Sequence, residues 1–229
     1  MRGTRYLVIS DLQVPFQARG ALDFVRRVAR DYAVPRANVI CVGDEVDQYF
    51  GALYAKDPDA GLSPKTELEA TRAMLHPWYR AFPELRLCIS NHGLRWARRA
   101  FEAQIPAELL KPWRDVIGAP AGWHWRHRWD IDTKHRWSVI HGLGYSGVTA
   151  HRTAALDLGR SVAIGHLHGH GGVARITTET QNIWGMNTGC LIDVDAYAFQ
   201  YGKYSRFKPT LGVGVVLDDG KTPLFVPYA

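Results

Sequence analysis

Side chains that can bind metal ions follow five short apolar runs of this 229-residue sequence. They are Asp11, Asp44, Asn91 with His92, His141, and His166 with His168. Carboxylate, amide carbonyl and imidazole groups are the ligands that manganese, iron, zinc and nickel accept in proteins, and no cysteine is among them. His166 and His168 are two residues apart, so on an extended segment both side chains point to the same side, roughly 6–7 Å apart. This spacing suits one ligand to each of two neighbouring ions.

The five apolar runs are typical of strands covered on both faces, because their apolarity is continuous rather than alternating. They span residues 6–10, 39–42, 85–89, 139–140 and 162–164. Segments with helical spacing, residues 21–32 and 66–82, separate the first three runs. This order predicts an α/β fold with a parallel or mixed sheet. Because the carboxyl ends of such strands converge on one crevice, we expect the metal-binding side chains to meet there.

From about Trp123 onward the apolar segments are shorter and alternate with polar residues. They span residues 123–129, 172–180, 183–190, 211–217 and 224–226. This texture predicts antiparallel strands, and two stacked sheets with helices outside would accommodate both halves of the chain. No linker rich in Pro, Gly or Ser divides the sequence, so we expect one domain over residues 1–229.

The polar blocks resemble, in order, those of the calcineurin-like metallophosphoesterases. The family pattern runs Asp-x-His, Gly-Asp-x-x-Asp, Gly-Asn-His-Asp/Glu, a lone His, and Gly-His-x-His. Here the blocks read Asp11-Leu12-Gln13, Gly43-Asp44-Glu45-Val46-Asp47, Ser90-Asn91-His92-Gly93, His141-Gly142 and Gly165-His166-Leu167-His168. The opening Ser-Asp-Leu-Gln is similar to that of phage-encoded members. The resemblance implies a four-layer α/β/β/α sandwich of two mixed β-sheets flanked by helices.

The resemblance also implies a set of ligands for two divalent metal ions. Asp11 and His168 would bind one ion, Asn91, His141 and His166 would bind the other, and Asp44 would bridge them. Gln13 stands where most members have His, so its amide oxygen would be a weaker ligand in the first site. Mn²⁺ is the favoured ion, with Fe, Zn or Ni as alternatives.

Two further residues carry catalytic roles by the same resemblance. His92 would contact the phosphate and assist the leaving group, and Asp47 would support the site without binding a metal. The family's Gly before the Asn-His pair is Ser90 here, which the backbone can tolerate. Gly93 replaces the acid that usually follows and orients the imidazole, which leaves the protonation state of His92 open.

These residues predict an enzyme, a dinuclear metal-dependent phosphoesterase that hydrolyses phosphate esters by a metal-bound hydroxide. The net charge of +6 and three arginines after His92, namely Arg95, Arg98 and Arg99, favour a phosphodiesterase or nuclease that acts on a polyanion. A phosphomonoesterase acting on nucleotides or phosphoproteins is the first alternative. The second is a catalytically weak nucleic-acid-binding protein, in which Gln13 and Gly93 mark decay of the site.

Two other patterns point elsewhere. Residues 123–129 alternate Trp with His and Arg, as on a surface that stacks bases, although we favour a strand with a buried Trp face. Residues 142–147 resemble the glycine-rich turn of dinucleotide-binding sites. That turn needs an acid roughly 20 positions further on, where this chain has His166, so we expect a tight turn instead.

The N-terminal apolar run is too short for a signal peptide or a membrane span. We therefore expect a cytoplasmic protein, in the host cytoplasm if it is phage-encoded, with a phosphate-ester substrate and no membrane partner. Nucleic acid is one such substrate. The sequence leaves the oligomeric state open.

Overall fold

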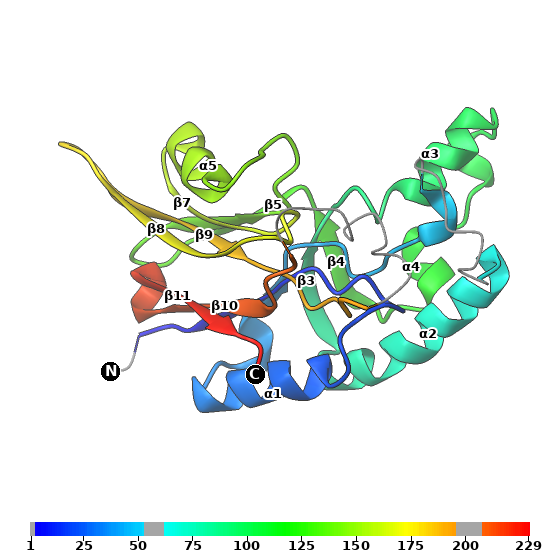
Figure 1. Cartoon of the computed structure of the whole chain (residues 1–229), viewed down its shortest axis with the longest axis horizontal. Helices are drawn as coiled ribbons and strands as arrows, with labels where there is room; N and C mark the ends of the chain where they lie inside the picture. Colours follow the sequence, from blue (N-terminus) through cyan, green and yellow to red (C-terminus); the bar gives the residue numbers. More distant parts are fainter. Residues whose placement is uncertain (1–2, 53–61, 196–207) are drawn as a thin grey trace.

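The computed structural model describes residues 3–52, 62–195 and 208–229, which form two stacked β-sheets with helices on both outer faces (Figure 1). Helices α1 and α2 lie below the first sheet in this view, and α5 lies above the second. The four-layer α/β/β/α arrangement predicted from the sequence is therefore confirmed.

The first sheet has the strand order β11-β10-β1-β2-β3-β4. Its strands are β1 (Tyr6–Ile9), β2 (Val39–Cys41), β3 (Glu84–Cys88), β4 (Gly122–Arg126), β10 (Gly212–Leu217) and β11 (Thr222–Pro227). The second sheet has the order β5-β6-β7-β9-β8. Its strands are β5 (Arg128–Ile131), β6 (Trp137–Ile140), β7 (Ser161–Ile164), β8 (Gly171–Thr177) and β9 (Asn182–Thr188).

The described α-helices are α1 (Ala21–Asp31), α2 (Pro64–Ala81), α3 (Arg95–Glu102), α4 (Trp113–Ile117) and α5 (Ala150–Leu158). Short 3₁₀ turns are η1 (Arg36–Asn38), η2 (Tyr49–Gly51), η4 (Ala107–Leu109) and η6 (Asp218–Gly220). None of these helices combines the length and the apolar character that crossing a membrane requires.

Both faces of the central strands are buried, which explains the continuous apolarity of their sequences. In β1, Leu7 and Ile9 pack toward α1 and α2, where they join Phe24 and Leu75. Val8 points the other way and joins the layer between the two sheets. Successive strand residues face opposite sides, so a strand between two apolar layers needs apolar residues at every position.

Strands β1, β2, β3 and β4 run parallel, and so do β6, β7 and β9. Helix α1 connects β1 to β2, α2 lies between β2 and β3, and α5 connects β6 to β7. Parallel neighbours require such crossovers. The loops that leave β1, β2 and β3 consequently emerge at one edge of the first sheet, and those that leave β6 and β7 emerge together from the second.

Two expectations for the second half are wrong. Residues 123–129 do not form one strand, because the chain leaves β4 at His127 and passes to β5 in the other sheet. The second sheet is also not antiparallel throughout, since β6, β7 and β9 are parallel and only its edge pairs β5–β6 and β8–β9 are antiparallel. The buried Trp face is present, with Trp123 fully buried and the Arg and His side chains of the segment exposed.

Candidate metal centre

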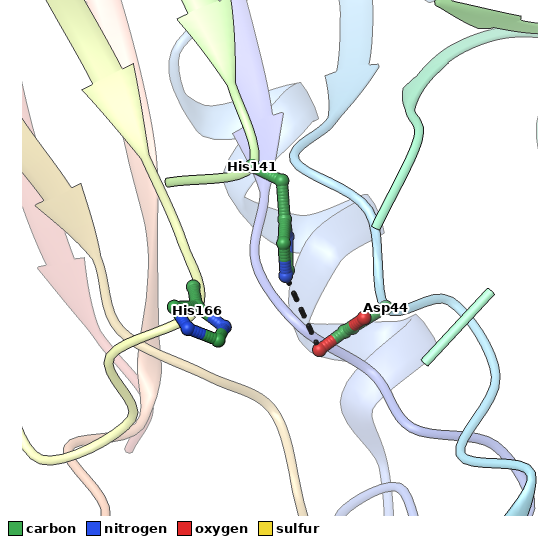
Figure 2. A group of neighbouring side chains, drawn as sticks. All are labelled: Asp44, His141 and His166. Atoms are coloured by element: carbon green, nitrogen blue, oxygen red, sulfur yellow. Dashed lines mark ion pairs between the residues drawn. The ribbon is translucent and has the colours of Figure 1, made fainter. Parts of the chain in front are cut away.

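The predicted metal-binding side chains meet where the loops after five strands come together. Asp11 follows β1, Asp44 follows β2, Asn91 and His92 follow β3, His141 follows β6, and His166 with His168 follows β7. Figure 2 shows Asp44, His141 and His166 approaching one another from three of these loops. Both sheets therefore contribute to one centre.

The side chains form two overlapping groups, and Asp44 belongs to both. One group is Asp44, His141 and His166, and the other is Asp11, Asp44 and His168; within each, the donor atoms lie within 4.8 Å of one another. His141 Nε2 lies 3.5 Å from Asp44 Oδ2, and His168 Nε2 lies 3.1 Å from Asp11 Oδ2. A carboxylate shared by two groups of donors is the arrangement expected of a bridging ligand.

Asn91 and Gln13 lie beside the two groups. Asn91 Oδ1 lies 2.7 Å from His141 Nε2. Gln13 is fully buried, and its Nε2 lies 3.3 Å from His168 Nε2. The amide of Gln13 thus lies between His168 and His92, whose Nε2 is 3.4 Å from Gln13 Nε2.

Several buried oxygens of the centre have no hydrogen-bond partner among the described residues. These are Asp11 Oδ1, Gln13 Oε1 and Asp44 Oδ2. A buried acceptor that lacks a partner costs about 1–3 kcal/mol, and more when it is charged. Cations at this place would satisfy all three atoms, so the residues present fit the binding of divalent metal.

The backbone is in the left-handed region at three of these positions. The φ angles are 48° at Gln13, 47° at Asp44 and 69° at His166. For a residue other than glycine this conformation is unfavourable and is often found at functional sites. The backbone N–H groups of Leu12 and Gln13 both donate to the carbonyl oxygen of Asp44, at 3.1 and 2.8 Å, which ties the first two loops together.

Ser90 has a role that the sequence did not indicate. Its Oγ accepts hydrogen bonds from the backbone N–H of Asp44 at 2.9 Å and of Gly93 at 3.2 Å. The hydroxyl thereby connects the loop after β2 to the loop after β3. A glycine at this position could not make either bond, so Ser90 is more than a tolerated replacement.

Asp47 contacts the imidazole of His92, next to which the chain has Gly93 rather than an acidic residue. His92 is buried, and its Nδ1 lies 2.9 Å from Asp47 Oδ1, while its Nε2 lies 3.8 Å from Asp44 Oδ2. Burial alone would lower the pKa of His92, but the carboxylates of Asp44 and Asp47 outweigh it and raise the pKa above its ordinary value. Asp47 therefore orients the imidazole so that Nε2 faces the centre.

Charge around the centre sets two further protonation states. Burial alone would raise the pKa of Asp44, but His141 and His92 outweigh it and hold that pKa well below its usual range. Burial, together with the neighbouring His141, lowers the pKa of His166. An ionised carboxylate and a neutral imidazole are the forms that bind metal.

The structure separates the three arginines proposed to guide the substrate. Arg95 reaches the centre: its Nη2 lies 2.8 Å from His92 Nε2, and its Nη1 donates to the backbone carbonyl of Asp47 at 2.8 Å. Arg99 instead donates to the backbone carbonyls of Gly51 and Ala52, and Arg98 is exposed on α3.

Comparison with known proteins gives distant neighbours. No family model matches the chain, and no curated protein sequence matches it. Among solved structures, wild-type Vps29 from Entamoeba histolytica complexed with Zn²⁺ is 11% identical, with a TM-score of 0.44 over 96% of this chain and 89% of that chain. A single mutant of the same protein is 12% identical, with a TM-score of 0.42 over 99% and 100% of the two chains.

Proposed function

We propose that this chain is a dinuclear metal-dependent phosphoesterase of the calcineurin-like type. The observation that carries the proposal is the shared carboxylate of Asp44, which belongs to two groups of donors and has a buried oxygen without a hydrogen-bond partner. The order of the motifs along the sequence supports the same assignment.

The two ions would be held by ligands from both sheets. Asp11, Gln13, Asp44 and His168 would hold one ion, and Asp44, Asn91, His141 and His166 would hold the other. This set of oxygen and nitrogen donors suits Mn²⁺ and also accepts Fe, Zn or Ni. When bound, such ions lower the pKa of water toward neutrality and offset the charge of the phosphoryl group.

The residues beside the ligands supply the rest of the chemistry. His92 turns Nε2 toward the centre, and on giving up its contact with Arg95 Nη2 it would donate a proton or a hydrogen bond to the departing oxygen. Asp47 holds the ring through Nδ1. Arg95, whose side chain is only 12% exposed, would bind a non-bridging phosphate oxygen with its fixed positive charge.

Within this class we favour a phosphodiesterase or nuclease over a monoesterase. The net charge of +6 and the cationic side chain of Arg95 at the centre suit a polyanionic substrate. A phosphatase acting on nucleotides or phosphoproteins is the alternative. Salt-dependent binding of nucleic acid without any metal-dependent turnover would instead favour a catalytically weak binding protein.

The deciding experiment compares hydrolysis of bis-p-nitrophenyl phosphate and p-nitrophenyl phosphate with and without added Mn²⁺, alongside elemental analysis of the protein. We expect two ions per chain at saturation, stimulation by Mn²⁺, and a preference for the diester. Asp44→Asn is the matched control, because it keeps the side-chain shape and removes the bridging charge. Faster hydrolysis of the monoester would select the alternative, and no metal-stimulated release from either compound would refute the proposal.

A further inference from the structure

A pocket of about 600 Å³ is lined by residues of the loops after β2 and β3, of helices α3 and α4, and of strand β4. Figure 1 shows where α3, α4 and β4 lie. The walls of the pocket include Glu45, Ser90, Gly93, Trp96, Trp113 and Trp125. Most of the lining is apolar. The volume is in the range of small-molecule sites, and the residues proposed to bind metal do not form it.

The pocket and the metal centre are built on the same two loops. Glu45 directly follows Asp44, and Ser90 and Gly93 stand on either side of Asn91 and His92. Residues next to the proposed ligands in the chain thus line the pocket. This adjacency makes the pocket a candidate for the organic part of the substrate.

The aromatic walls suit a flat ring. The rings of Trp96 and Trp113 lie nearly parallel, with centroids 6.0 Å apart and an interplanar angle of 23°. Trp125 adds a third indole. Bases stack on such side chains, and each stacked base contributes about 1–3 kcal/mol to binding.

Glu45 adds a buried carboxyl group whose two oxygens differ in their partners. The residue is 1% exposed, and its Oε1 accepts hydrogen bonds from Trp113 Nε1 at 3.2 Å and Trp125 Nε1 at 3.1 Å. Its Oε2 has no hydrogen-bond partner among the described residues. Glu45 lines an aromatic pocket, and its unpaired oxygen would accept a hydrogen bond from a ligand that carries an N–H group.

We infer that this pocket receives a nucleobase of the substrate, stacked against its tryptophans, with an N–H on the edge of the base donating to Oε2 of Glu45. This rests on the proposed phosphoesterase function, whose substrate class it narrows to nucleotides or nucleic acid. A nucleobase combines the flat face and the N–H edge that the pocket requires. A lipid chain has neither, and the ring of a tyrosyl ester lacks the N–H group.

The test measures binding without turnover. Tryptophan fluorescence is titrated with the four nucleoside 5′-monophosphates, with phenyl phosphate and with ribose 5-phosphate, in the presence of a chelator. We expect quenching and saturation by the nucleotides, at least roughly tenfold weaker binding of phenyl phosphate, and weaker binding still of ribose 5-phosphate.

Two variants and one control locate the binding. Ala97 lines the pocket, so Ala97→Phe fills it without removing an existing side chain, and nucleotide affinity should fall roughly tenfold or more. Ala103→Phe is the matched control at an exposed position at the end of α3, and it should bind as the unaltered protein does. Glu45→Gln keeps an oxygen for the two indoles and replaces the free acceptor by a donor, so affinity should fall roughly tenfold.

The outcomes separate this inference from the proposed function. Equal binding of nucleotides and ribose 5-phosphate, or unchanged affinity in Ala97→Phe, overturns the nucleobase site even if the protein hydrolyses diesters. Base-dependent binding that Ala97→Phe abolishes supports the site even if no Mn²⁺-dependent hydrolysis is found, in which case only the proposed function fails. Phenyl phosphate binding as tightly as the nucleotides overturns the role of Glu45.

Discussion

Asp44 contacts several of the loops that form the metal centre. Its Oδ1 accepts a hydrogen bond from the backbone N–H of His92 at 3.1 Å, and its Oδ2 lies 3.5 Å from His141 Nε2. Its backbone carbonyl holds the loop after β1. Asp44, in the loop after β2, thus contacts the loops after β1, β3 and β6 and helps to hold the donor groups together.

At the residue scale, His92→Ala should lower kcat for diester hydrolysis by roughly 10²–10⁴-fold, because it removes the proton donor for the leaving oxygen. Metal content measured by elemental analysis should stay at the level of the unaltered protein, since His92 is not a proposed ligand. A variant that keeps full kcat would show that His92 has no part in the reaction.

Gln13→His should strengthen the metal site formed with Asp11 and His168. An imidazole is a better donor than a neutral amide for manganese, iron or zinc, so the weaker of two ions should bind more tightly. Isothermal titration with Mn²⁺ measures this directly. Gln13→Ala is the opposing control and should weaken the same site; affinities that are equal in all three proteins would place Gln13 outside the ligand set.

That these candidate ligands lie close together could be predicted from the sequence, whereas the contacts that support them could not. Each candidate ligand lies just after an apolar run, so its position can be predicted from the neighbouring residues of the sequence. The bond from Asp47 to His92, and the two bonds to Ser90 Oγ, join residues from different loops. Such contacts depend on backbone angles, including the left-handed φ of 47° at Asp44, which the sequence does not specify.

At the scale of the elements, the loop after β7, which carries two of the histidines, is held close to the first sheet. Gly165 follows β7, and a Cβ at this position would lie 2.4 Å from Val42 Cγ2 and 2.6 Å from Asp11 Oδ1. Both distances are shorter than any stable contact. The absence of a side chain at Gly165 is therefore what allows the loop with His166 and His168 to approach the loops of the other sheet.

We accordingly expect Gly165→Ala to lower the free energy of unfolding by about 1–3 kcal/mol through overpacking, and to weaken metal binding. Urea unfolding and titration with Mn²⁺ measure the two effects. Gly144→Ala is the control, because Gly144 has a φ of 88° and a Cβ added there would meet no other atom. Only the backbone cost of about 1–2 kcal/mol should therefore appear in this variant. Unimpaired metal binding in Gly165→Ala would contradict this account.

The positions of helices α1 and α2 could be predicted from the helical spacing of their apolar residues. The predicted helix at 21–32 ends one residue beyond α1, and the one at 66–82 begins two residues after Pro64, the true start of α2. Segment 123–129 failed because its alternation is the same in β4 and in β5. Periodicity identifies a strand, but it does not say to which sheet the strand belongs or where the chain crosses from one sheet to the other.

At the scale of the whole molecule, the centre joins the two sheets. Asp11, Asp44 and Asn91 come from the first sheet, and His141 and His166 come from the second. The layer between the sheets is largely apolar, and Val8 and Ile40 of the first sheet share it with Trp137 and Met186 of the second. Ions bound at the centre would act on the stability of both sheets at once.

Thermal unfolding should therefore depend on metal. A ligand that binds only the folded state, present at 100 times its dissociation constant, stabilises it by about 2.7 kcal/mol. For a chain of this size this corresponds to a rise in Tm of roughly 5–10 °C.

We expect Mn²⁺ to raise Tm by this amount in calorimetry, and a chelator to reverse the rise. In Asp44→Asn the rise should be largely lost, because the shared ligand has lost its charge. If the unaltered protein showed no rise, or if Asp44→Asn showed the same rise, the ions would bind elsewhere. A single transition in these scans would also bear out the expectation of one domain, because the two sheets would then unfold together.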